Sequence, residues 1–136
     1  MLYTYTSSEQ TVAAGGSVVL ENNGLTGNCA MINHTAGSTT ITLKQGTYII
    51  HFNCDATSAT TGALSFQLYN NDVAVPSALT TNTIATANDI SNFGFTTSIK
   101  VFCSCPAIDN TARLTIRNTG ANPAIISNVA VTIHRQ

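Results

Sequence analysis

The clearest alternation of apolar and polar residues in the chain lies within Gly46–Pro76. Its first part, Thr47–Ala56, predicts a strand, because every second side chain of a strand points to the same face and one row here is apolar throughout. A second segment, Ala63–Tyr69, alternates strictly between apolar and polar side chains. Both segments are typical of antiparallel strands that pack one face against a second sheet.

The same period of two predicts short strands along the rest of the chain, whereas helix-forming runs are nearly absent. The expected strands are Leu2–Thr6, Ser17–Glu21, Ala30–His34, Ser38–Leu43, Thr47–Ala56, Ala63–Tyr69, Val73–Leu79, Phe93–Cys105, Ala112–Asn118 and Ile125–Arg135. The segment Thr80–Asn88 predicts either a weak strand or a surface loop. About ten short antiparallel strands predict an all-β jelly-roll sandwich, which we expect to form a single domain over residues 1–136.

Three of these strands carry apolar residues on both faces, with Ile49, Phe102 and Ala130 opposite the main apolar rows. Isolated apolar side chains are common on protein surfaces, but a monomer rarely exposes an apolar patch. We therefore expect the second face of this sheet to be buried between copies in a homo-oligomer. The expected interface residues are Ile49, His51, Lys100, Phe102, Ala130, Thr132 and His134, with Tyr3 or Tyr5 as a further member.

Charged side chains make up only 8% of the chain, against about a quarter in typical soluble domains, and the formal net charge is -1. So little charge gives no long-range attraction for nucleic acid or anionic membranes, and we expect neither as a partner. No window reaches the roughly 18 consecutive apolar residues of a membrane span. The N-terminus lacks the basic start and apolar core of a signal peptide, so a complete chain would be made in the cytosol.

The cysteines indicate packing rather than chemistry. None of them belongs to a CxxC pair, and the four are Cys29, Cys54, Cys103 and Cys105. We expect reduced thiols that act as small apolar side chains. Two alternatives stay open, namely a disulfide between Cys103 and Cys105 and a metal site that includes His34 or His51. We expect neither a metal nor another cofactor.

The sequence does not predict an enzyme. His34, His51 and His134 are the only plausible bases, and no serine stands in a Gly-x-Ser-x-Gly elbow. The six acidic residues are dispersed along the chain, which does not indicate a pair of catalytic carboxylates. His51 lies in mid-strand, where we expect a packed and hydrogen-bonded residue rather than a catalyst.

Three motifs carry a resemblance to a known family. The first, Gly46–Phe52, matches Gly-x-Tyr-x-aromatic-x-aromatic, with Ile50 in place of the middle aromatic. The second, Phe66–Pro76, matches a hairpin motif L-x-L-x-x-N-G-x-x-V-P, with Asp72 in place of glycine. The third comprises Leu114–Asn118, the turn at Gly120 and the strand Val129–Ile133. Together they resemble the globular heads of the complement and tumour-necrosis-factor (TNF) superfamily, in its bacterial and phage branch, which includes heads of collagen-like spore-surface proteins.

This resemblance implies a ten-strand, TNF-like jelly roll that assembles as a homotrimer, with one sheet lining the threefold axis. Some family members hold calcium with clustered acidic loop residues. The aspartates here are dispersed, at Asp55, Asp72, Asp89 and Asp109, and do not support such a site. The chain has no collagen-like Gly-x-y run.

Two classes of function follow from these features. The first is a structural phage virion component, such as a capsid-decoration, head-fibre or tail-tip trimer, whose partners are its own copies and a capsid or other virion protein. A start at Met1, the missing signal peptide, the nearly uncharged Thr- and Asn-rich composition and free cysteines favour it. We accordingly expect the protein to be located in the virion.

The second class is a trimeric head that binds a host cell-surface glycan or protein through loops at one end. The candidate loops are Asn22–Asn28, Thr57–Gly62, Thr80–Asn92 and Asp109–Ala112. Their candidate ligand-binding residues are Asn22, Asn23, Asn28, Asn82, Asn88, Asp89, Asp109 and Asn110. These side chains suit sugar hydroxyls, although the loops hold few aromatic residues for stacking. A spore-surface (exosporium) trimer, located at the spore or cell surface, is a third alternative.

Overall fold

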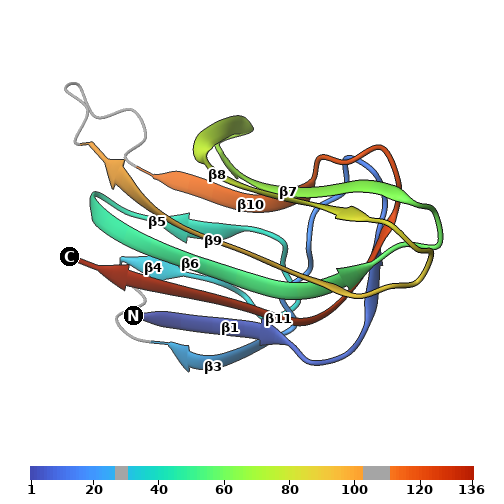
Figure 1. The fold of residues 1–136 in the computed structure, drawn as a ribbon. Helices are drawn as coiled ribbons and strands as arrows, with labels where there is room; N and C mark the ends of the chain where they lie inside the picture. The colour runs from blue at the N-terminus through green and yellow to red at the C-terminus, as the bar shows by residue number, and fades with distance from the viewer. Residues whose placement is uncertain (27–30, 103–110) are drawn as a thin grey trace.

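Two antiparallel β-sheets face each other in the computed structural model, which describes residues 1–26, 31–102 and 111–136 (Figure 1). The strands are β1 (Leu2–Thr6), β2 (Gln10–Val12), β3 (Asn22–Thr26), β4 (Ile32–Asn33), β5 (Ile41–Leu43), β6 (Gly46–Thr57), β7 (Gly62–Asn70), β8 (Val73–Ile84), β9 (Ser91–Val101), β10 (Ala112–Asn118) and β11 (Ala124–Arg135).

The larger sheet has the strand order β3-β1-β11-β6-β9, and the smaller sheet has the order β4-β5-β10-β7-β8. Strand β11 pairs with β6 along one edge. Along its other edge it pairs with β2 near its first residues and with β1 near its last ones. Leu2 is paired with Ile133, so the two chain termini lie side by side at one end of the sandwich (Figure 1). The expected all-β sandwich is confirmed.

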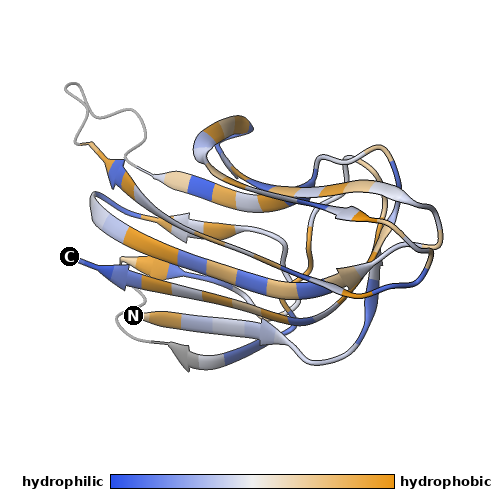
Figure 2. Cartoon of the chain, viewed as in Figure 1, coloured by the Kyte–Doolittle hydropathy of each residue, from blue (hydrophilic) through white to orange (hydrophobic). Residues whose placement is uncertain are grey.

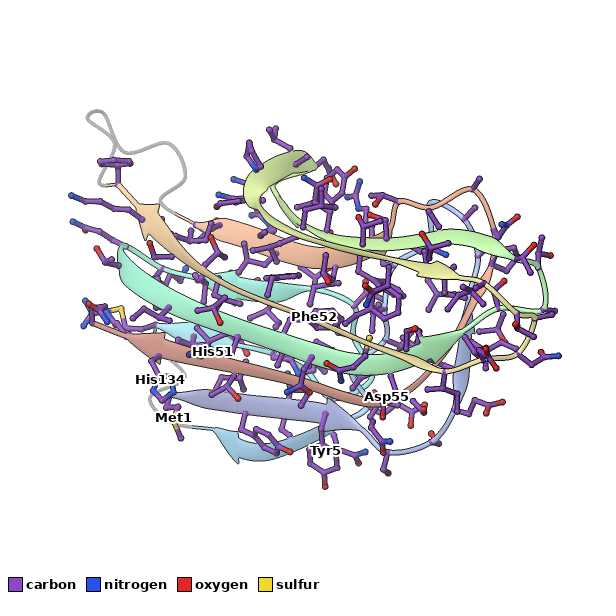
Figure 3. All side chains as sticks on the ribbon, viewed as in Figure 1. Met1, Tyr5, His51, Phe52, Asp55 and His134 are labelled. Atoms are coloured by element: carbon purple, nitrogen blue, oxygen red, sulfur yellow. The ribbon has the colours of Figure 1, made fainter. Side chains whose placement is uncertain are left out.

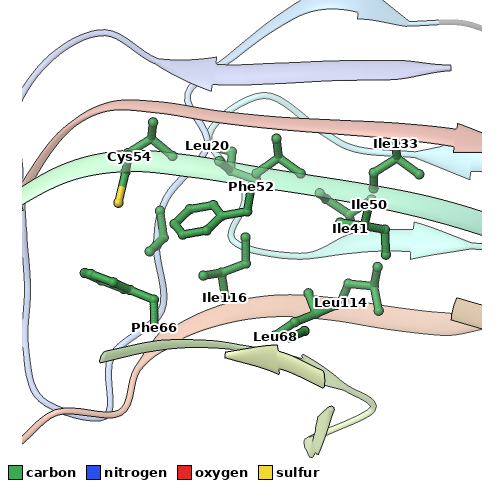
Figure 4. Packing of buried hydrophobic residues seen from close by; sticks show 14 of the residues in the cluster. Leu20, Ile41, Ile50, Phe52, Cys54, Phe66, Leu68, Leu114, Ile116 and Ile133 are labelled. Atoms are coloured by element: carbon green, nitrogen blue, oxygen red, sulfur yellow. The ribbon is translucent and has the colours of Figure 1, made fainter. Parts of the chain in front are cut away.

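The core lies between the sheets and consists of the apolar rows that the alternation predicted. Along β6, Tyr48, Ile50, Phe52 and Cys54 are buried, and hydropathy alternates in bands along this strand (Figure 2). The Phe52 ring meets that of Phe66 across the core at 6.1 Å between centroids (Figure 4). A small apolar cavity between the sheets, lined by Ile50, Leu68 and Ile133 among others, measures about 10 Å³, about the space of a single water.

The expected strand Ser17–Glu21 is wrong, although its alternation is real. Val18 and Leu20 are buried, but only Ser17 forms a bridge, to Arg117. Side chains replace the missing ladder, because the Gln10 amide donates to Val19 O at 2.8 Å and accepts from Val19 N at 3.0 Å. Alternation reports burial, and here the polar backbone atoms are bonded partly to side chains and partly through single backbone bonds, such as Val18 N to Ile116 O at 2.8 Å, that do not continue as a ladder.

Three further differences concern polar strands. Gln10–Val12 was expected to be loop and forms β2, and Asn22–Thr26 was also expected to be loop and forms β3. Val73–Leu79 and Thr80–Asn88 were treated as separate segments, whereas β8 runs without a break to Ile84. Strand β8 is an edge strand with few buried side chains, which is why it lacks an apolar row.

Polar side chains link the edges of the two sheets where β8 lies beside β9. The hydroxyls of Ser77 and Thr97 are 3.0 Å apart, and Asn82 donates from Nδ2 to the carbonyl of Asn92 at 2.7 Å. The amide of Gly94 also donates to Thr80 Oγ1, at 3.4 Å. The threonine- and asparagine-rich segment 77–97 thus closes one side of the sandwich.

Candidate functional site

The candidate site is the outer face of the larger sheet, which we define as the face that points away from the smaller sheet. Strand register places the side chains of this face in rows. One row crosses four strands through Tyr3, Thr132, His51 and Thr96. The adjacent rows are Tyr5, Ala130, Asn53 and Gly94 on one side, and His134, Ile49 and Ser98 on the other.

The structure therefore brings together the predicted interface residues Ile49, His51, Ala130, Thr132 and His134, which come from β6 and β11. Lys100 occupies the same face of β9, opposite Thr47, and Phe102 follows the last residue of that strand. Phe102 is 67% exposed, and the Lys100 ammonium lies 5.1 Å from the centroid of its ring. Whether this face forms a trimer interface stays a prediction.

The chemistry of the outer face is mixed. Ile49, Ala130 and Thr132 are half-buried, while His51, Asn53 and His134 are exposed (Figure 3). Threonine, serine and histidine side chains stand between the apolar ones, so the face offers hydrogen-bonding groups as well as apolar contact. A partner on this face would have to satisfy both.

Two tyrosines extend the face across β1 to the edge strand β3. The rings of Tyr3 and Tyr5 lie 5.5 Å apart at an interplanar angle of 30°. Gly24 on β3 makes room for them, because a Cβ at this position would come within 2.6 Å of the Tyr3 ring. The sequence signal for Tyr3 and Tyr5 was their alternation along β1, but the role of Gly24 depends on strand pairing that no local pattern reveals.

At the far end of the outer face, Asp55 is held by two amides. Asn128 donates to its Oδ2 at 3.0 Å, and Asn92 donates to its Oδ1 at 3.1 Å. These hydrogen bonds, from Asn128 first and then Asn92, lower the pKa of Asp55 below its ordinary value. Asn128 has a positive φ of 53° where the pairing of β11 with β6 is interrupted, which turns its side chain toward β6.

The predicted ligand loops do not form one site. Asn88 and Asp89 lie in the exposed loop between β8 and β9, where Asn88 N donates to Ser58 O at 2.9 Å and so joins residues 58–61. Thr111, which leads into β10, lies at the opposite end of the sandwich, because β9 runs the length of the molecule in between (Figure 1). The prediction that all four loops gather at one end of the sandwich was therefore wrong.

Three of the predicted ligand-binding residues lie in strands instead of loops. Asn22 and Asn23 belong to β3, and Asn82 belongs to β8. The amides of Asn23 and Asn82 are used internally, because Asn23 donates to His34 O at 2.9 Å and Asn82 binds the carbonyl of Asn92. The remaining candidates Asn28, Asp109 and Asn110 lie outside the described residues.

His34 is a structural link rather than part of a plain turn. It is buried, its Nδ1 lies 2.6 Å from Asn23 Oδ1, and its Nε2 lies 3.0 Å from Ser38 O. Within residues 1–26, 31–102 and 111–136, no three His, Cys, Asp or Glu side chains gather as metal ligands. In the same residues, no helix is long and apolar enough to cross a membrane.

Among the cysteines, Cys54 is a buried free thiol in the core (Figure 4). Burial, assisted by the negative charge of Asp55, raises the pKa of Cys54 to about 12. A thiol in this state is an inert packing residue, as expected for Cys54. The expectations for Cys29, Cys103 and Cys105 lie outside the described residues.

A polar groove of about 310 Å³ lies on the smaller sheet, away from the outer face. Its lining residues are Thr40, Asn71, Asp72, Arg113 and Thr115. Beside it, the guanidinium of Arg117 pairs with the Asp72 carboxylate and stacks 4.3 Å from the centroid of the Tyr69 ring. Sequence motifs do not predict this groove, because it is assembled from β10, the turn between β7 and β8 and the residue that precedes β5.

Solved structures share this arrangement of two sheets. An Eiger TNF from S. frugiperda is 8% identical with a TM-score of 0.71, covering 100% of this chain and 92% of that chain. The globular domain of zebrafish complement 1qA is 10% identical with a TM-score of 0.62, covering 99% of this chain and 97% of that chain. The chain has a TNF-like jelly-roll fold.

A weaker likeness links the TNF-like chain to PRD1 vertex protein P5, at 15% identity and a TM-score of 0.49, over 96% of this chain and 93% of that chain. This value is too low to carry an inference. No protein-family model matches the sequence, and no curated protein matches it either.

Proposed function

We propose that this chain is a non-catalytic structural protein that assembles as a homotrimer through the outer face of its larger sheet. The outer face itself carries the proposal. It places Tyr3, Tyr5 and Ile49 on one surface, which no second layer covers in the described part of the chain, and Phe102 follows directly after β9 of the same sheet (Figure 1). Aromatic residues are enriched at interfaces and charged residues are depleted, as on this face.

The resemblance of the Gly46–Pro76 motifs to trimeric heads supports the same face, because the sheet that lines the threefold axis in that family contains the Gly-x-Tyr strand. In this chain that strand is β6, which lies at the middle of the outer face between β11 and β9. The polar side chains of the face, such as Thr132 and Ser98, would then form hydrogen bonds between copies.

We further propose that the trimer is a phage virion component, such as a capsid-decoration, head-fibre or tail-tip protein. Two observations support this proposal. The motifs resemble those of the bacterial and phage branch, and only 8% of the residues are charged, which leaves a neutral surface rich in threonine and asparagine. Virion proteins assemble in the host cytosol, where thiols such as that of Cys54 stay reduced.

Analytical ultracentrifugation tests the assembly. The unmodified chain is expected to sediment as three copies at micromolar concentration, and Phe102→Asp is expected to sediment as one, because an unpaired charge in a desolvated interface costs several kcal/mol. Val73→Asp is the matched control, since Val73 is also 67% exposed but lies in the hairpin of the smaller sheet. It should leave the trimer intact.

A monomeric unmodified chain would contradict the trimer, and a Phe102→Asp variant that stays trimeric would show that another surface forms it. The virion role is tested separately, by mixing the purified protein with intact capsids and with host cells. Capsid binding alone supports decoration, whereas cell binding alone supports a receptor-binding head.

The second candidate function, recognition of a host glycan or protein, is favoured by the polar groove of the smaller sheet. Its hydroxyl, amide, carboxylate and guanidinium groups suit the hydroxyls of a sugar, and a trimer built through the larger sheet leaves the groove open. Thr115→Val would weaken cell binding in this case, with Thr83→Val, at an exposed position of β8 outside the groove, as control. A spore-surface role shares this chemistry and differs in where the protein is found.

A further inference from the structure

Two histidines of the outer face lie next to each other, His51 on β6 and His134 on β11 (Figure 3). Register pairs His51 with Thr132, so His134 takes the diagonal position two residues along β11. Diagonal neighbours on one face of an antiparallel pair are within reach of long side chains. The two imidazole centroids are 6.2 Å apart, and the ring planes meet edge to face at 89°.

This separation suits a shared metal ion. A divalent transition metal ion binds an imidazole nitrogen at about 2.0–2.1 Å, which places it about 3.2 Å from the ring centroid. Two imidazoles on one ion therefore have centroids about 5 to 6.5 Å apart, depending on the angle at the metal. The observed 6.2 Å lies at the wide end of this range, where the angle at the metal is about 150°. The His134 ring can turn toward His51 by rotation about χ2, a soft torsion in histidine, because its side chain is exposed.

A third side chain orients one of the ligands. His51 Nδ1 lies 2.9 Å from Oγ1 of Thr96 on β9. When Nδ1 donates its proton to this hydroxyl, the lone pair of Nε2 faces solvent and is available to an ion. A hydrogen bond at the second ring nitrogen is the usual companion of a metal-binding histidine, because it fixes the tautomer and the ring direction.

We propose that His51 and His134 form a site for one divalent transition metal ion, with Zn²⁺, Ni²⁺ and Cu²⁺ as the chemical class. Imidazole suits these ions, whereas Ca²⁺ and Mg²⁺ require several oxygen ligands. The carboxylate of the same face of β6, Asp55, is four residues from His51 and is held by Asn92 and Asn128. The protein ligands are therefore two imidazoles, and water occupies the remaining positions.

Both ligands belong to one chain, so the site does not depend on the proposed trimer. It also differs from the other histidine of the chain. Both ring nitrogens of His34 lie against oxygen acceptors in a buried position, which leaves no nitrogen for an ion. His34 is thus an internal control for any histidine-specific measurement.

The test is a titration of the full chain, without a polyhistidine tag, with Zn²⁺ alone, followed by histidine ring resonances in NMR and by calorimetry. The expected result is saturable binding of one ion per chain, with the resonances of His51 and His134 shifting together while those of His34 stay in place. His51→Asn and His134→Asn are each expected to weaken binding at least tenfold, because each removes one of two ligands. Asn53→Ala, on the same strand and face, should bind as the unmodified chain does.

Thr96→Val removes the hydroxyl that orients His51 and retains both ligands, so binding is expected to weaken by a smaller factor than in either histidine variant. Binding that is unchanged in His51→Asn or in His134→Asn would overturn the proposal, as would a shift of only one ring. Sedimentation of the same samples keeps this result separate from the trimer, because a chain that binds Zn²⁺ as a monomer supports the site and contradicts the assembly.

Discussion

Asn71 and Asp72 form a turn that adopts positive φ angles and also contacts β10 through the side chain of Asp72. Both have positive φ, at 50° and 66°, which is the geometry of a type I′ hairpin turn. Glycine would adopt these angles without strain, and the related hairpin motif has glycine at the position of Asp72. The Asp72 carboxylate instead pairs with Arg117, whose guanidinium stacks on Tyr69. The departure from the motif therefore ties the hairpin to β10.

The Cys54 thiol predicts a pH dependence of stability. Its pKa is raised from 9.0 to about 12 in the folded chain, so between these values the unfolded state loses a proton that the folded state keeps. Folding stability is therefore unaffected by Cys54 below about pH 8, and it falls as pH rises above 9. By pH 10.5 the loss should reach about 2 kcal/mol.

The measurement compares urea unfolding of the unmodified chain with that of Cys54→Ala between pH 7.5 and 10.5. Other titrating groups are common to both proteins and cancel in the difference. The advantage of the unmodified chain should shrink as pH rises. A difference that stays constant across this range would show that the thiol titrates alike in both states.

Asn118 illustrates what a local pattern leaves out at the scale of single residues. It is fully buried, donates from Nδ2 to Val12 O at 3.1 Å and to Asn122 O at 2.9 Å, and accepts from Gly120 N at 3.0 Å. The sequence pattern placed it only at the end of the predicted strand Ala112–Asn118. The partner at Val12 is 106 residues away, so the role of Asn118 follows from topology and not from its neighbours in sequence.

At the scale of elements, the Gln10 side chain supplies hydrogen bonds to the segment 17–21 that a neighbouring strand would otherwise make. It makes two hydrogen bonds to the backbone of Val19. Gln10→Ala is expected to lower the free energy of unfolding by about 1 kcal/mol, because it leaves the half-buried N–H of Val19 without its partner, while the carbonyl of Val19 keeps the hydrogen bond from Thr6 Oγ1 at 2.8 Å. Equilibrium urea denaturation measures the change. Gln45→Ala is the control, because Gln45 is an exposed glutamine in the turn before β6, and it should leave the free energy of unfolding nearly unchanged. Equal losses in the two variants would contradict the role given to Gln10.

The same segment shows why some elements could be predicted and others could not. Rows such as Tyr48, Ile50 and Phe52 were correct because alternation reports which side chains avoid water. Alternation does not report whether a segment is hydrogen-bonded along a neighbouring strand, which is why the strand predicted at Ser17–Glu21 was wrong. Strands β2 and β3 and residues 80–84 of β8 carry few apolar residues, so their pairing left no periodic signal.

At the scale of the whole molecule, the trimer predicts a thermal midpoint that depends on concentration. Assembly stabilises the folded chain by mass action, so the unfolding midpoint should rise by several degrees over a hundredfold increase in concentration. Differential scanning calorimetry or circular dichroism measures the shift. Phe102→Asp should unfold at one temperature throughout, and a midpoint independent of concentration in the unmodified chain would count against assembly.

The candidate site was predictable only in part, because alternation places side chains within one strand and does not show which strands are neighbours. Alternation correctly assigned Ile49, His51, Ala130, Thr132 and His134 to the faces of their own strands, and strand pairing then brought them together. The contact between His51 and His134, the space above Gly24 and the groove of the smaller sheet each depend on which strands are neighbours. The pattern of residues within a single strand does not show these neighbours, which follow from the strand order of the sheets.

The pairing of Leu2 with Ile133 gives the molecule a nearly circular chain. A short linker from Gln136 to Met1 would turn β11 and β1 into an ordinary hairpin, and the chain could then be opened elsewhere, for instance within residues 58–61 or 85–90, without breaking a ladder. The order in which the strands are synthesised is therefore separable from the order in which they pair. For engineering, this offers a choice of which end of the sandwich carries a fused peptide.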